Sequence, residues 1–417
     1  MSAVAGLLSS SNASQSLDNK GDLVGEYQDK ILVRNSKGMN AGSTLFGLMS
    51  KLKAEPSENT EFNWFERDPV RRELSADGAN AVAPATQNQA GTIVFQETSA
   101  GGDAWQFLAE GHILRNDTTG EYVKVTVTPT TNTVSVLRAI NTSDAPTLAT
   151  YVIADNDVLT IITLGKDEGA LPTRASYEEP DVLTNYIQTY NSVVELTNAF
   201  KANKLRSDKA GPLRARRIQA LEKIAKDIES SFLLGVKSRQ TGTNGFQYFT
   251  GGIADAINTA VPANFLDGLG GTGVTLDVFL AWLETFMTVG SDAKLALCGP
   301  RAYSVISSFA NKAANGFRIM NQETVFGMNI TVINTPFGEL DLAFHPLLKE
   351  VPTYNDWIFV VDLAHVMQKT MEPLFLEPNI QTPGQDSYKE QFRAKLGLKL
   401  RFAEAFGYAS DLVLITT

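Results

Sequence analysis

The sequence has little of the residue chemistry from which metal and redox sites are usually built. It contains one cysteine, Cys298, and three histidines, His112, His345 and His365, in 417 residues. A single cysteine excludes a disulfide within the chain and a cysteine-based metal site. The histidines are scattered and lack the spacing of metal ligands. We therefore expect structural roles for all three, and we interpret Cys298 as a small buried hydrophobe at the end of a strand.

Long hydrophobic runs and an excess of positive charge are also missing. No segment has the roughly 18 uninterrupted apolar residues that a membrane span requires. The first residues, MSAVAGLLSSSNASQS, lack the basic start of a signal peptide. These absences predict a soluble protein kept in a reducing cytoplasm, with no membrane partner. The formal net charge of −10 argues against a protein that grips phosphate backbones, although a surface could still face nucleic acid.

Motifs of catalysis and cofactor binding are absent or incomplete. Gly268–Gly273 matches G-x-G-x-x-G, but the preceding PANFLD is not typical of a strand, so we predict a flexible loop before a helix. No serine lies in a G-x-S-x-G turn. Asp155 and Asp157 are a weak calcium signal, because the rest of a ligand loop is missing. We assign no catalytic, cofactor-binding or metal-binding residue and no cofactor, and a hydrolytic enzyme is left as a remote alternative.

The most informative segment is a helical pattern between Pro212 and Gly235. Proline fits the first turn of a helix, where its missing N–H costs nothing, and glycine fits the end. Apolar residues recur at steps of three and four, which predicts an amphipathic helix over 213–234. A long rod without a catalytic residue indicates a mechanical element. Its apolar face contains Ile218, Leu221, Ile224 or Ala225, Ile228 and Phe232, and its solvated face contains Arg214, Arg216, Arg217, Lys223, Lys226, Asp227 and Glu229.

A basic patch surrounds this helix. Between Lys201 and Arg239 there are eleven basic residues and four acidic ones, in a chain whose net charge is negative. Nucleic-acid binding would favour interleaved aromatic residues or a recognition fold, and neither is evident. We predict that these side chains form ion pairs with acidic residues, and the acidic segment Asp167–Glu179 is one candidate partner.

The remaining segments of the chain differ in composition and in the spacing of their apolar residues. Residues 1–57 carry apolar residues only in short clumps such as Ile31–Val33, so this segment needs another surface to become ordered. TEFNWF (60–65) and GTIVFQ (91–96) are typical of two strands of an extended hairpin, and 103–164 of a small inserted β-barrel or sandwich. TLDVFLAWLETFMTVG predicts a helix capped by Thr275. Helices and strands are interleaved without a regular βαβ rhythm, so the predicted fold class is α+β.

Four stretches carry a resemblance to a known family. They are EKIAKDIESSFLLG (222–235), ITVINTPFGELDLAFHPLL (330–348), DWIFVVDLAHVMQKTMEPLFLEP (356–378) and YKEQFRAKLGLKLRFAEAFGYASDL (388–412). With the order of the segments, they resemble the major capsid proteins of tailed double-stranded DNA bacteriophages, which have the Hong Kong 97-like fold. The resemblance implies an N-terminal arm (1–57), an extended loop hairpin (58–102 and 165–180), an inserted β domain (103–164), a peripheral domain (181–262 and 363–417) with a spine helix (213–234), and an axial domain (263–362).

The resemblance also implies a function. The chain would be a major capsid protein that self-assembles into the icosahedral shell enclosing the phage double-stranded DNA genome. Implied partners are other copies in hexamers and pentamers, a scaffold protein, a portal, and decoration or cement proteins, with DNA enclosed without sequence-specific binding. Assembly would occur in the host cell cytoplasm, and the product would be the virion capsid. The alternative is an encapsulin-like cellular nanocompartment shell protein, which the polar arm and the β insertion disfavour.

Overall fold

The computed structural model describes residues 52–67, 72–77, 83–96, 104–166, 168–169, 180–202, 212–243, 245–268, 273–311, 318–325 and 328–413, with side chains for all of these except 310–331. The chain divides into two compact units. The main unit is Met1–Asn63 together with Thr184–Thr417, and the inserted unit is Trp64–Leu183. Most of the predicted N-terminal arm, 1–51, lies outside the described residues.

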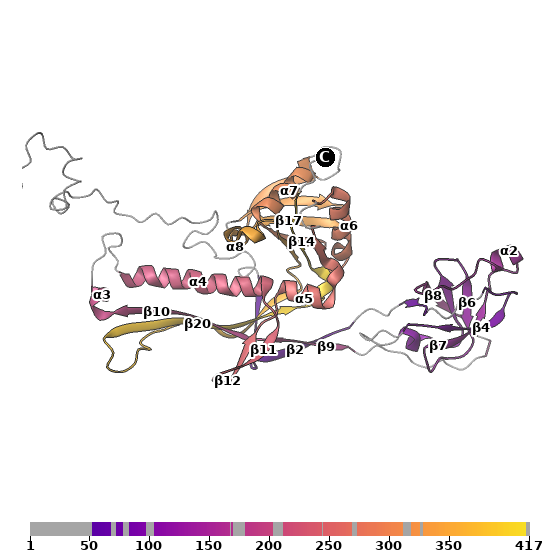
Figure 1. Cartoon of the computed structure of the whole chain (residues 1–417), viewed down its shortest axis with the longest axis horizontal. Helices are drawn as coiled ribbons and strands as arrows, with labels where there is room; N and C mark the ends of the chain where they lie inside the picture. The colour runs from indigo at the N-terminus through magenta and orange to yellow at the C-terminus, as the bar shows by residue number, and fades with distance from the viewer. Residues whose placement is uncertain are drawn as a thin grey trace, which may run out of the picture. The chain divides into compact units, whose positions relative to one another are not determined.

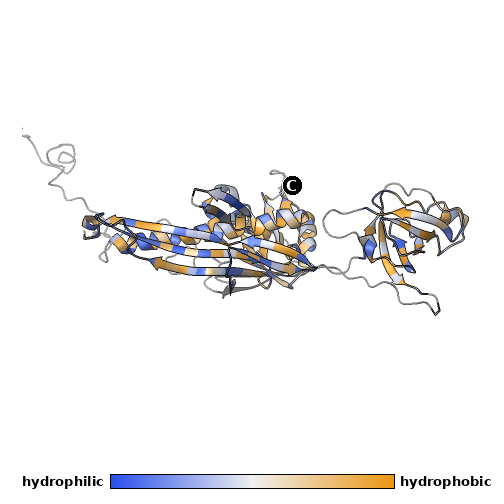
Figure 2. Ribbon diagram, turned by 90° about the horizontal axis from the view of Figure 1, so that it is seen from below, coloured by the Kyte–Doolittle hydropathy of each residue, from blue (hydrophilic) through white to orange (hydrophobic). Residues whose placement is uncertain are grey.

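A four-stranded sheet forms one layer of the main unit (Figure 1). Its strand order is β1 (Lys53–Pro56), β19 (Val366–Glu377), β20 (Ser387–Leu400) and β10 (Gln188–Thr197). β10 and β20 pair antiparallel without a register shift, whereas β1 is parallel to β19. Buried and exposed side chains alternate along β10, which is the pattern of a strand with one covered face. Figure 2 shows hydrophobic and hydrophilic residues alternating along the long strands.

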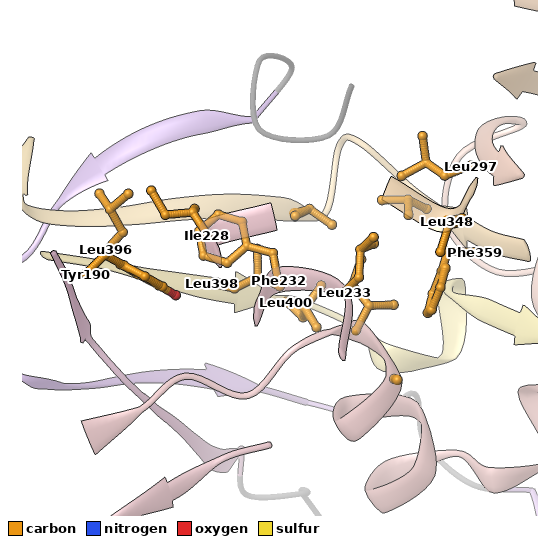
Figure 3. Packing of buried hydrophobic residues seen from close by; sticks show 14 of the residues in the cluster. Tyr190, Ile228, Phe232, Leu233, Leu297, Leu348, Phe359, Leu396, Leu398 and Leu400 are labelled. Atoms are coloured by element: carbon orange, nitrogen blue, oxygen red, sulfur yellow. The ribbon is translucent and has the colours of Figure 1, made fainter. Parts of the chain in front are cut away.

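The covered face packs against α4 (Pro212–Leu234), so the helix predicted over 213–234 is confirmed. Three predicted apolar residues, Ile224, Ile228 and Phe232, are at most 1% exposed. They share one hydrophobic core with residues of β10 and β20 (Figure 3). The chain ends the helix at a glycine for a steric reason, because a Cβ on Gly235 would lie 2.3 Å from the carbonyl oxygen of Ser231.

The predicted division of α4 into two faces is wrong at both ends. Glu229, assigned to the solvated face, is completely buried, whereas Ile218, assigned to the apolar face, is 36% exposed. The C-terminal half of α4 is covered from a second side, since its core also contains Leu297, Leu348 and Phe359 from another layer (Figure 3). The spacing of apolar residues in a helix predicts one buried face, but it does not show that a second element packs against the other side.

A seven-stranded sheet forms this other layer. Alternate residues of β14 enter different cores: Leu295 and Leu297 join the core of α4, and Ala296 and Cys298 join the core of α6 and α7. A strand covered on both faces is expected to be a continuous apolar run, as LALC is. In order, the strands are β13 (Phe265–Asp267), β21 (Gly407–Ser410), β18 (Ile358–Val361), β14 (Ala293–Cys298), β17 (Gly338–Phe344), β16 (Met328–Thr335) and β15 (Arg318–Val325).

Two helices of the main unit, α6 and α7, lie beside β14 and β17 of this sheet in Figure 1. The predicted cap of α6 is confirmed, because the Thr275 side chain accepts a hydrogen bond from the Val278 N–H. The remaining elements of the unit are α3 (Asn198–Ala202), β11 (Ser238–Gly242), β12 (Gly245–Phe249), α5 (Ile253–Ala260), α6 (Leu276–Met287), α7 (Pro300–Asn311), α8 (Pro346–Glu350) and the 3-10 turns Pro262–Asn264, Pro352–Tyr354 and Ala403–Ala405.

One expectation is wrong in this layer, and one strand crosses a predicted domain boundary. Phe265–Asp267 was expected to be loop before the glycine motif, but it forms the short strand β13, parallel to β21. The glycine loop itself lies largely outside the described residues, at 269–272. β21 comes from the segment assigned to the peripheral domain, yet it pairs with β18 in the seven-stranded sheet. Strands of three or four residues are too short for periodicity to reveal them or their partners.

The inserted unit is a small closed barrel with its own core. Its strand order is β3, β8, β5, β6, β7 and β4, and a bridge between Ala76 and Phe95 joins the two outer strands. The interior is apolar and includes Ile93, Leu114 and Val123, each fully buried. The bounds are β3 (Glu73–Ser75), β4 (Gln89–Val94), β5 (His112–Asn116), β6 (Tyr122–Val125), β7 (Thr133–Arg138), β8 (Val158–Leu164), α2 (Ala145–Leu148) and a 3-10 turn at Ala104–Phe107.

The predicted hairpin and the predicted start of the insertion are therefore corrected. GTIVFQ does not pair with TEFNWF, because β4 pairs with β7, from Gln89 opposite Arg138 to Val94 opposite Thr133. TEFNWF is β2 (Glu61–Glu66), and it pairs with β9 (Asp181–Tyr186). The barrel thus begins at β3 and not at residue 103. Alternation identifies a strand but does not name its partner.

Ile224→Asp tests the packing of α4. The variant places an unpaired charge in the shared core, so we expect a loss of about 4 kcal/mol in the free energy of unfolding. The matched control is Ile218→Asp, on the same helix but partly exposed, with an expected loss below about 1 kcal/mol. Urea titration followed by circular dichroism measures both, and equal losses would contradict the packing described.

Removal of the barrel tests its corrected boundary. Replacing 72–166 by a short Gly-Ser linker is expected to leave the main unit folded, because the whole barrel core leaves together. Replacing only 103–164 is expected to give aggregation, since β3 and β4 would keep apolar residues such as Ile93 without their partners. Size-exclusion chromatography and thermal melting distinguish the two; a well-behaved 103–164 deletion would refute the boundary.

Candidate functional site

A serine, an aspartate and a histidine meet beyond the end of α6. The Asp362 carboxylate is buried and accepts hydrogen bonds from the Ser291 backbone N–H at 2.8 Å and its hydroxyl at 2.9 Å. The Nδ1 of His365 lies 2.9 Å from the same carboxylate. Burial opposes ionisation of Asp362, but these hydrogen bonds hold its pKa below the usual range.

The connectivity of this cluster differs from that of a hydrolytic triad. A triad requires the serine hydroxyl to donate to the imidazole, which the acid orients from its other nitrogen. Here Ser291 and His365 both bind the carboxylate of Asp362. The cluster instead fixes a turn at Gly290, whose φ is +83° and where a Cβ would lie 2.5 Å from the same carboxylate. The arrangement therefore lacks the hydrogen bond from serine to histidine that the hydrolase alternative requires.

Lys294 is the second candidate, because lysines with lowered pKa values serve as bases and Schiff-base nucleophiles. It is 1% exposed, and burial lowers its pKa to about 8 against the opposing effect of Asp362. Its Nζ donates to the carbonyl oxygens of Phe286 at 2.8 Å, Val289 at 2.6 Å and Ala405 at 2.7 Å. Three carbonyls use all three donors, so Lys294 ties the end of α6 to the turn before β21.

The other candidates from the sequence are also structural. Cys298 is buried, and burial raises the pKa of its thiol, which makes it unreactive. The Nδ1 of His112 accepts a hydrogen bond from the Ala109 N–H at 2.7 Å, and burial lowers the pKa of this histidine. Within the described ranges no group of three or more histidine, cysteine, aspartate or glutamate side chains is placed to hold a metal ion.

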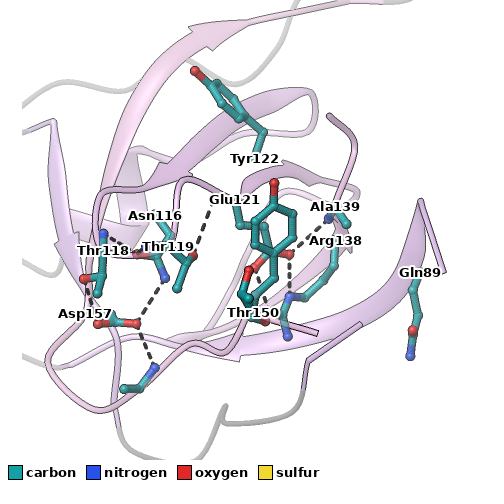
Figure 4. A network of polar contacts seen from close by, with 12 residues as sticks. Gln89, Asn116, Thr118, Thr119, Glu121, Tyr122, Arg138, Ala139, Thr150 and Asp157 are labelled. Atoms are coloured by element: carbon teal, nitrogen blue, oxygen red, sulfur yellow. Dashed lines mark hydrogen bonds and ion pairs between the residues drawn. The ribbon is translucent and has the colours of Figure 1, made fainter. Parts of the chain in front are cut away.

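In the barrel, polar side chains also form hydrogen bonds with one another (Figure 4). Arg138 donates to Glu121 through Nε at 2.9 Å and Nη2 at 2.7 Å, and both side chains are buried. Asp157, from the acidic pair considered for calcium, accepts hydrogen bonds from Asn116 at 3.1 Å and from Thr118 at 3.0 Å. Its carboxylate oxygens therefore accept hydrogen bonds that stabilise a turn.

Two of the five basic residues of α4 form ion pairs within the main unit. Arg217 contacts Glu390 of β20 with two hydrogen bonds of 2.7 Å, and Lys226 contacts Glu350 of α8 at 2.5 Å. The guanidinium lowers the pKa of Glu390, against the effect of burial. The candidate partner segment, Asp167–Glu179, lies almost entirely outside the described residues, and the partners found come from elsewhere in the sequence.

A buried polar pair was missed by sequence reasoning. The Nε2 of His345, the residue before α8, lies 2.9 Å from Oε1 of Glu229, and both side chains are completely buried. The His345 Nδ1 has no hydrogen-bond partner among the described atoms. The pair joins α4 to the loop after β17, which are 116 residues apart, so no local signal could have predicted it.

The largest exposed apolar side chain lies on the two-stranded ribbon of β2 and β9. Phe65 is 71% exposed, Val182 is 54% exposed and Leu183 is 38% exposed. We call these three residues the ribbon surface, which has two faces, because Val182 and Leu183 are consecutive in one strand and point to opposite sides. A two-stranded sheet is marginally stable alone, and exposed apolar residues gathered on one element mark contact sites. The ribbon surface can bind another apolar surface, but it carries no group that could perform a reaction.

Comparison with known sequences identifies relatives. The chain matches the family of the SU10 major capsid protein over residues 40–413. It is 24% identical over 380 residues to the major capsid protein of Pseudomonas phage PaMx41, covering 89% of this chain and 83% of that protein. No helix in the described part of the chain is long and apolar enough to cross a membrane.

Solved structures similar to this chain include the following three. The capsid of a native GTA particle is 7% identical, with 96% of this chain and 99% of that chain covered and a TM-score of 0.47. A structure from Mycobacterium phage Adephagia is 10% identical, covering 99% and 100%, with a TM-score of 0.44. The SrpI encapsulin of Synechococcus elongatus PCC 7942 is 12% identical, covering 58% and 78%, with a TM-score of 0.40.

Arg217→Gln tests the ion pair of α4. The lowered pKa of Glu390 means that its stabilising contribution is present above the pKa of the unfolded chain and is lost as pH falls through the folded-state pKa. We expect the variant to lose about 2 kcal/mol at pH 7, with a smaller difference from the parent chain at pH 3. Urea unfolding at both values measures this.

The control is Arg216→Gln, since Arg216 is exposed and its described hydrogen bond goes to Gln219 on the same helix. It is expected to change the free energy of unfolding by less than about 0.5 kcal/mol at either pH. A difference for Arg217→Gln that stays constant with pH would show that the pair does not depend on the charge of Glu390.

Proposed function

Because the chain belongs to the SU10 major capsid protein family, we propose that it builds a phage capsid from hexamers and pentamers of identical copies. The protein is a phage major capsid protein, so copies of it associate into a shell and it is a component of the virion. The observation that carries this conclusion is the family match over 40–413, which includes nearly every described element of both units.

The domain roles are part of the proposal. The peripheral domain corresponds to 181–262 and 363–417, with α4 as its spine, and the axial domain to 263–362. Two observations support this division: β10, β19 and β20 with α4 come from the first set, and β13 to β18 with α6 and α7 come from the second. β21 crosses the boundary, and α4 shares one core with both layers. The two domains would therefore act as one body within the shell.

Contact between copies is proposed to use the extended loop, whose base is the ribbon of β2 and β9. The ribbon surface supports this role, because its apolar side chains remain in water unless another surface covers them. Obligate contacts between subunits typically bury roughly 2,000–5,000 Å² and are more hydrophobic than transient ones. A neighbouring copy is the partner that a homo-oligomeric shell provides at every site.

The remaining partners follow from the same role. We expect a scaffold protein, a portal and decoration proteins, assembly in the host cytoplasm, and double-stranded DNA enclosed without sequence-specific contacts. The chain has no overall excess of positive charge, which supports enclosure of DNA without a strong grip on phosphate. The polar networks around Asp362 and Lys294 support a subunit without catalytic activity, because their donors are used internally. The nanocompartment alternative is disfavoured by the match to a phage family.

Phe65→Ser tests the proposed contact. The substitution removes the largest side chain of the ribbon surface, so we expect closed particles to be lost or sharply reduced while the melting temperature of the isolated subunit stays unchanged. Phe65→Leu keeps an apolar side chain and is expected to assemble. Negative-stain electron microscopy and sedimentation velocity measure both. Normal particles from Phe65→Ser would refute the role of the ribbon, and the absence of particles from the unmodified chain would refute the capsid proposal.

A further inference from the structure

The hairpin of β11 and β12, which projects from the main unit in Figure 1, carries a cation and aromatic rings on one side. Arg239 lies opposite Tyr248 in the pairing of the two strands. Phe246 is two residues before Tyr248, so all three side chains lie on the same side of the hairpin. The guanidinium carbon of Arg239 is 3.9 Å from the centroid of the Phe246 ring and 5.8 Å from that of the Tyr248 ring.

The rings and cations form a continuous strip. The ring of Tyr186, from β9, is 5.4 Å from the Tyr248 ring, which is 6.4 Å from the Phe246 ring. Beyond Tyr186, the Lys237 Nζ is 5.8 Å from the Tyr186 ring. Phe246 is 55% exposed, and both cations are exposed. We call these residues the hairpin face: Lys237, Tyr186, Tyr248, Arg239 and Phe246.

The hairpin face is basic. The segment 236–249 contains two basic residues and no acidic residue. Among the described residues, the partners of these cationic groups are neutral: Arg239 lies on aromatic rings, and the Lys237 Nζ donates to the Thr184 hydroxyl. Asp255 accepts a hydrogen bond at 2.9 Å from the backbone N–H of Lys237, before β11 begins. A guanidinium stacked on a ring keeps its N–H groups at the edge of its plane, where an anion can bind them.

The hairpin face has a property that the sequence did not reveal. Nucleic-acid binding favours aromatic residues among basic ones, and the basic patch between Lys201 and Arg239 lacked them as a sequence. The structure brings rings from outside that patch, because Tyr186 precedes it and Phe246 and Tyr248 follow it. Basic side chains that follow a phosphate backbone, together with rings on which bases stack, are the usual means of binding a single strand.

We propose that the hairpin face binds single-stranded nucleic acid, with Arg239 and Lys237 on phosphates and Phe246 stacked on a base. Tyr186 and Tyr248 are partly exposed and extend the platform toward a second base. A duplex keeps the faces of its bases stacked on one another, so it uses only the two charges. An acidic protein segment likewise uses only the charges. The inference goes beyond the proposed shell and does not depend on it.

Binding of an oligothymidylate of about 16 nucleotides tests the proposal. The unassembled full-length chain is titrated into the fluorescent oligonucleotide at low salt, and anisotropy is measured. We expect saturable binding that Phe246→Ala weakens about tenfold, because the stacking ring is lost. Phe246→Leu keeps an apolar side chain without the ring and is expected to bind as weakly. Arg239→Gln should lower the slope of log affinity against log salt concentration by about 0.7.

Two matched controls lie elsewhere on the main unit. Phe200→Ala removes another exposed ring, on α3, and Arg216→Gln removes another exposed charge, on α4. Both variants are expected to bind the oligonucleotide like the parent chain. Melting temperatures equal to that of the parent show that the variants are folded.

A duplex of the same length and a poly-glutamate chain distinguish this partner from the alternatives. We expect both to bind several-fold more weakly than the single strand and to be insensitive to Phe246→Ala. Binding of either one as tightly as the single strand overturns the proposal. A loss with Arg239→Gln but none with Phe246→Ala, or no binding at all, overturns it as well. These measurements need no particles, so they do not depend on whether shells form.

Discussion

Packing of α4 on the four-stranded sheet is the interaction on which the main unit depends. Its apolar residues share one core with β10 and β20, and this core continues into β14, β17 and β18 of the seven-stranded sheet. The four-stranded sheet would lose its apolar cover without this helix. A helix that packs on one face can be divided simply into an apolar side and a charged side. The C-terminal half of α4 also packs against a second group of residues, near His345. That second contact explains why a glutamate on its expected outer side is buried against a histidine.

The buried polar groups of the main unit serve the same arrangement. A charge removed from water needs a partner with good geometry, and removing only one partner is strongly destabilising. Lys294 holds the end of α6, Asp362 holds the turn at Gly290, and Glu390 holds the first half of α4 through Arg217. Because these groups are consumed by internal contacts, they are not free for catalysis. The apolar side chains that remain exposed include those of Phe65 and Val182, on the ribbon of β2 and β9.

The sequence predicted those features that depend on neighbouring residues and failed on those that depend on distant ones. The bounds of α4 and the cap of α6 were predicted because helix periodicity and capping act within a few residues. The partners of β2, β4 and β21 were not predicted, since nothing within a strand specifies which distant strand it meets. The pairing of Glu229 with His345 required knowledge that α8 lies against α4. The absence of a catalytic site was an expectation from missing motifs, and only coordinates could show how Ser291, Asp362 and His365 are connected.

The distribution of charge completes the physical account of a self-associating chain. Residues 64–183 contain eight basic and 17 acidic residues, so this unit carries a net charge of −9 out of −10 for the whole chain. The main unit is therefore nearly neutral. Like charges on facing copies oppose close association, and a nearly neutral main unit avoids that repulsion where many copies must pack side by side. The acidic excess is confined to the inserted unit, whose barrel core is independent of the main unit, so it can remain solvated without weakening the packing around α4.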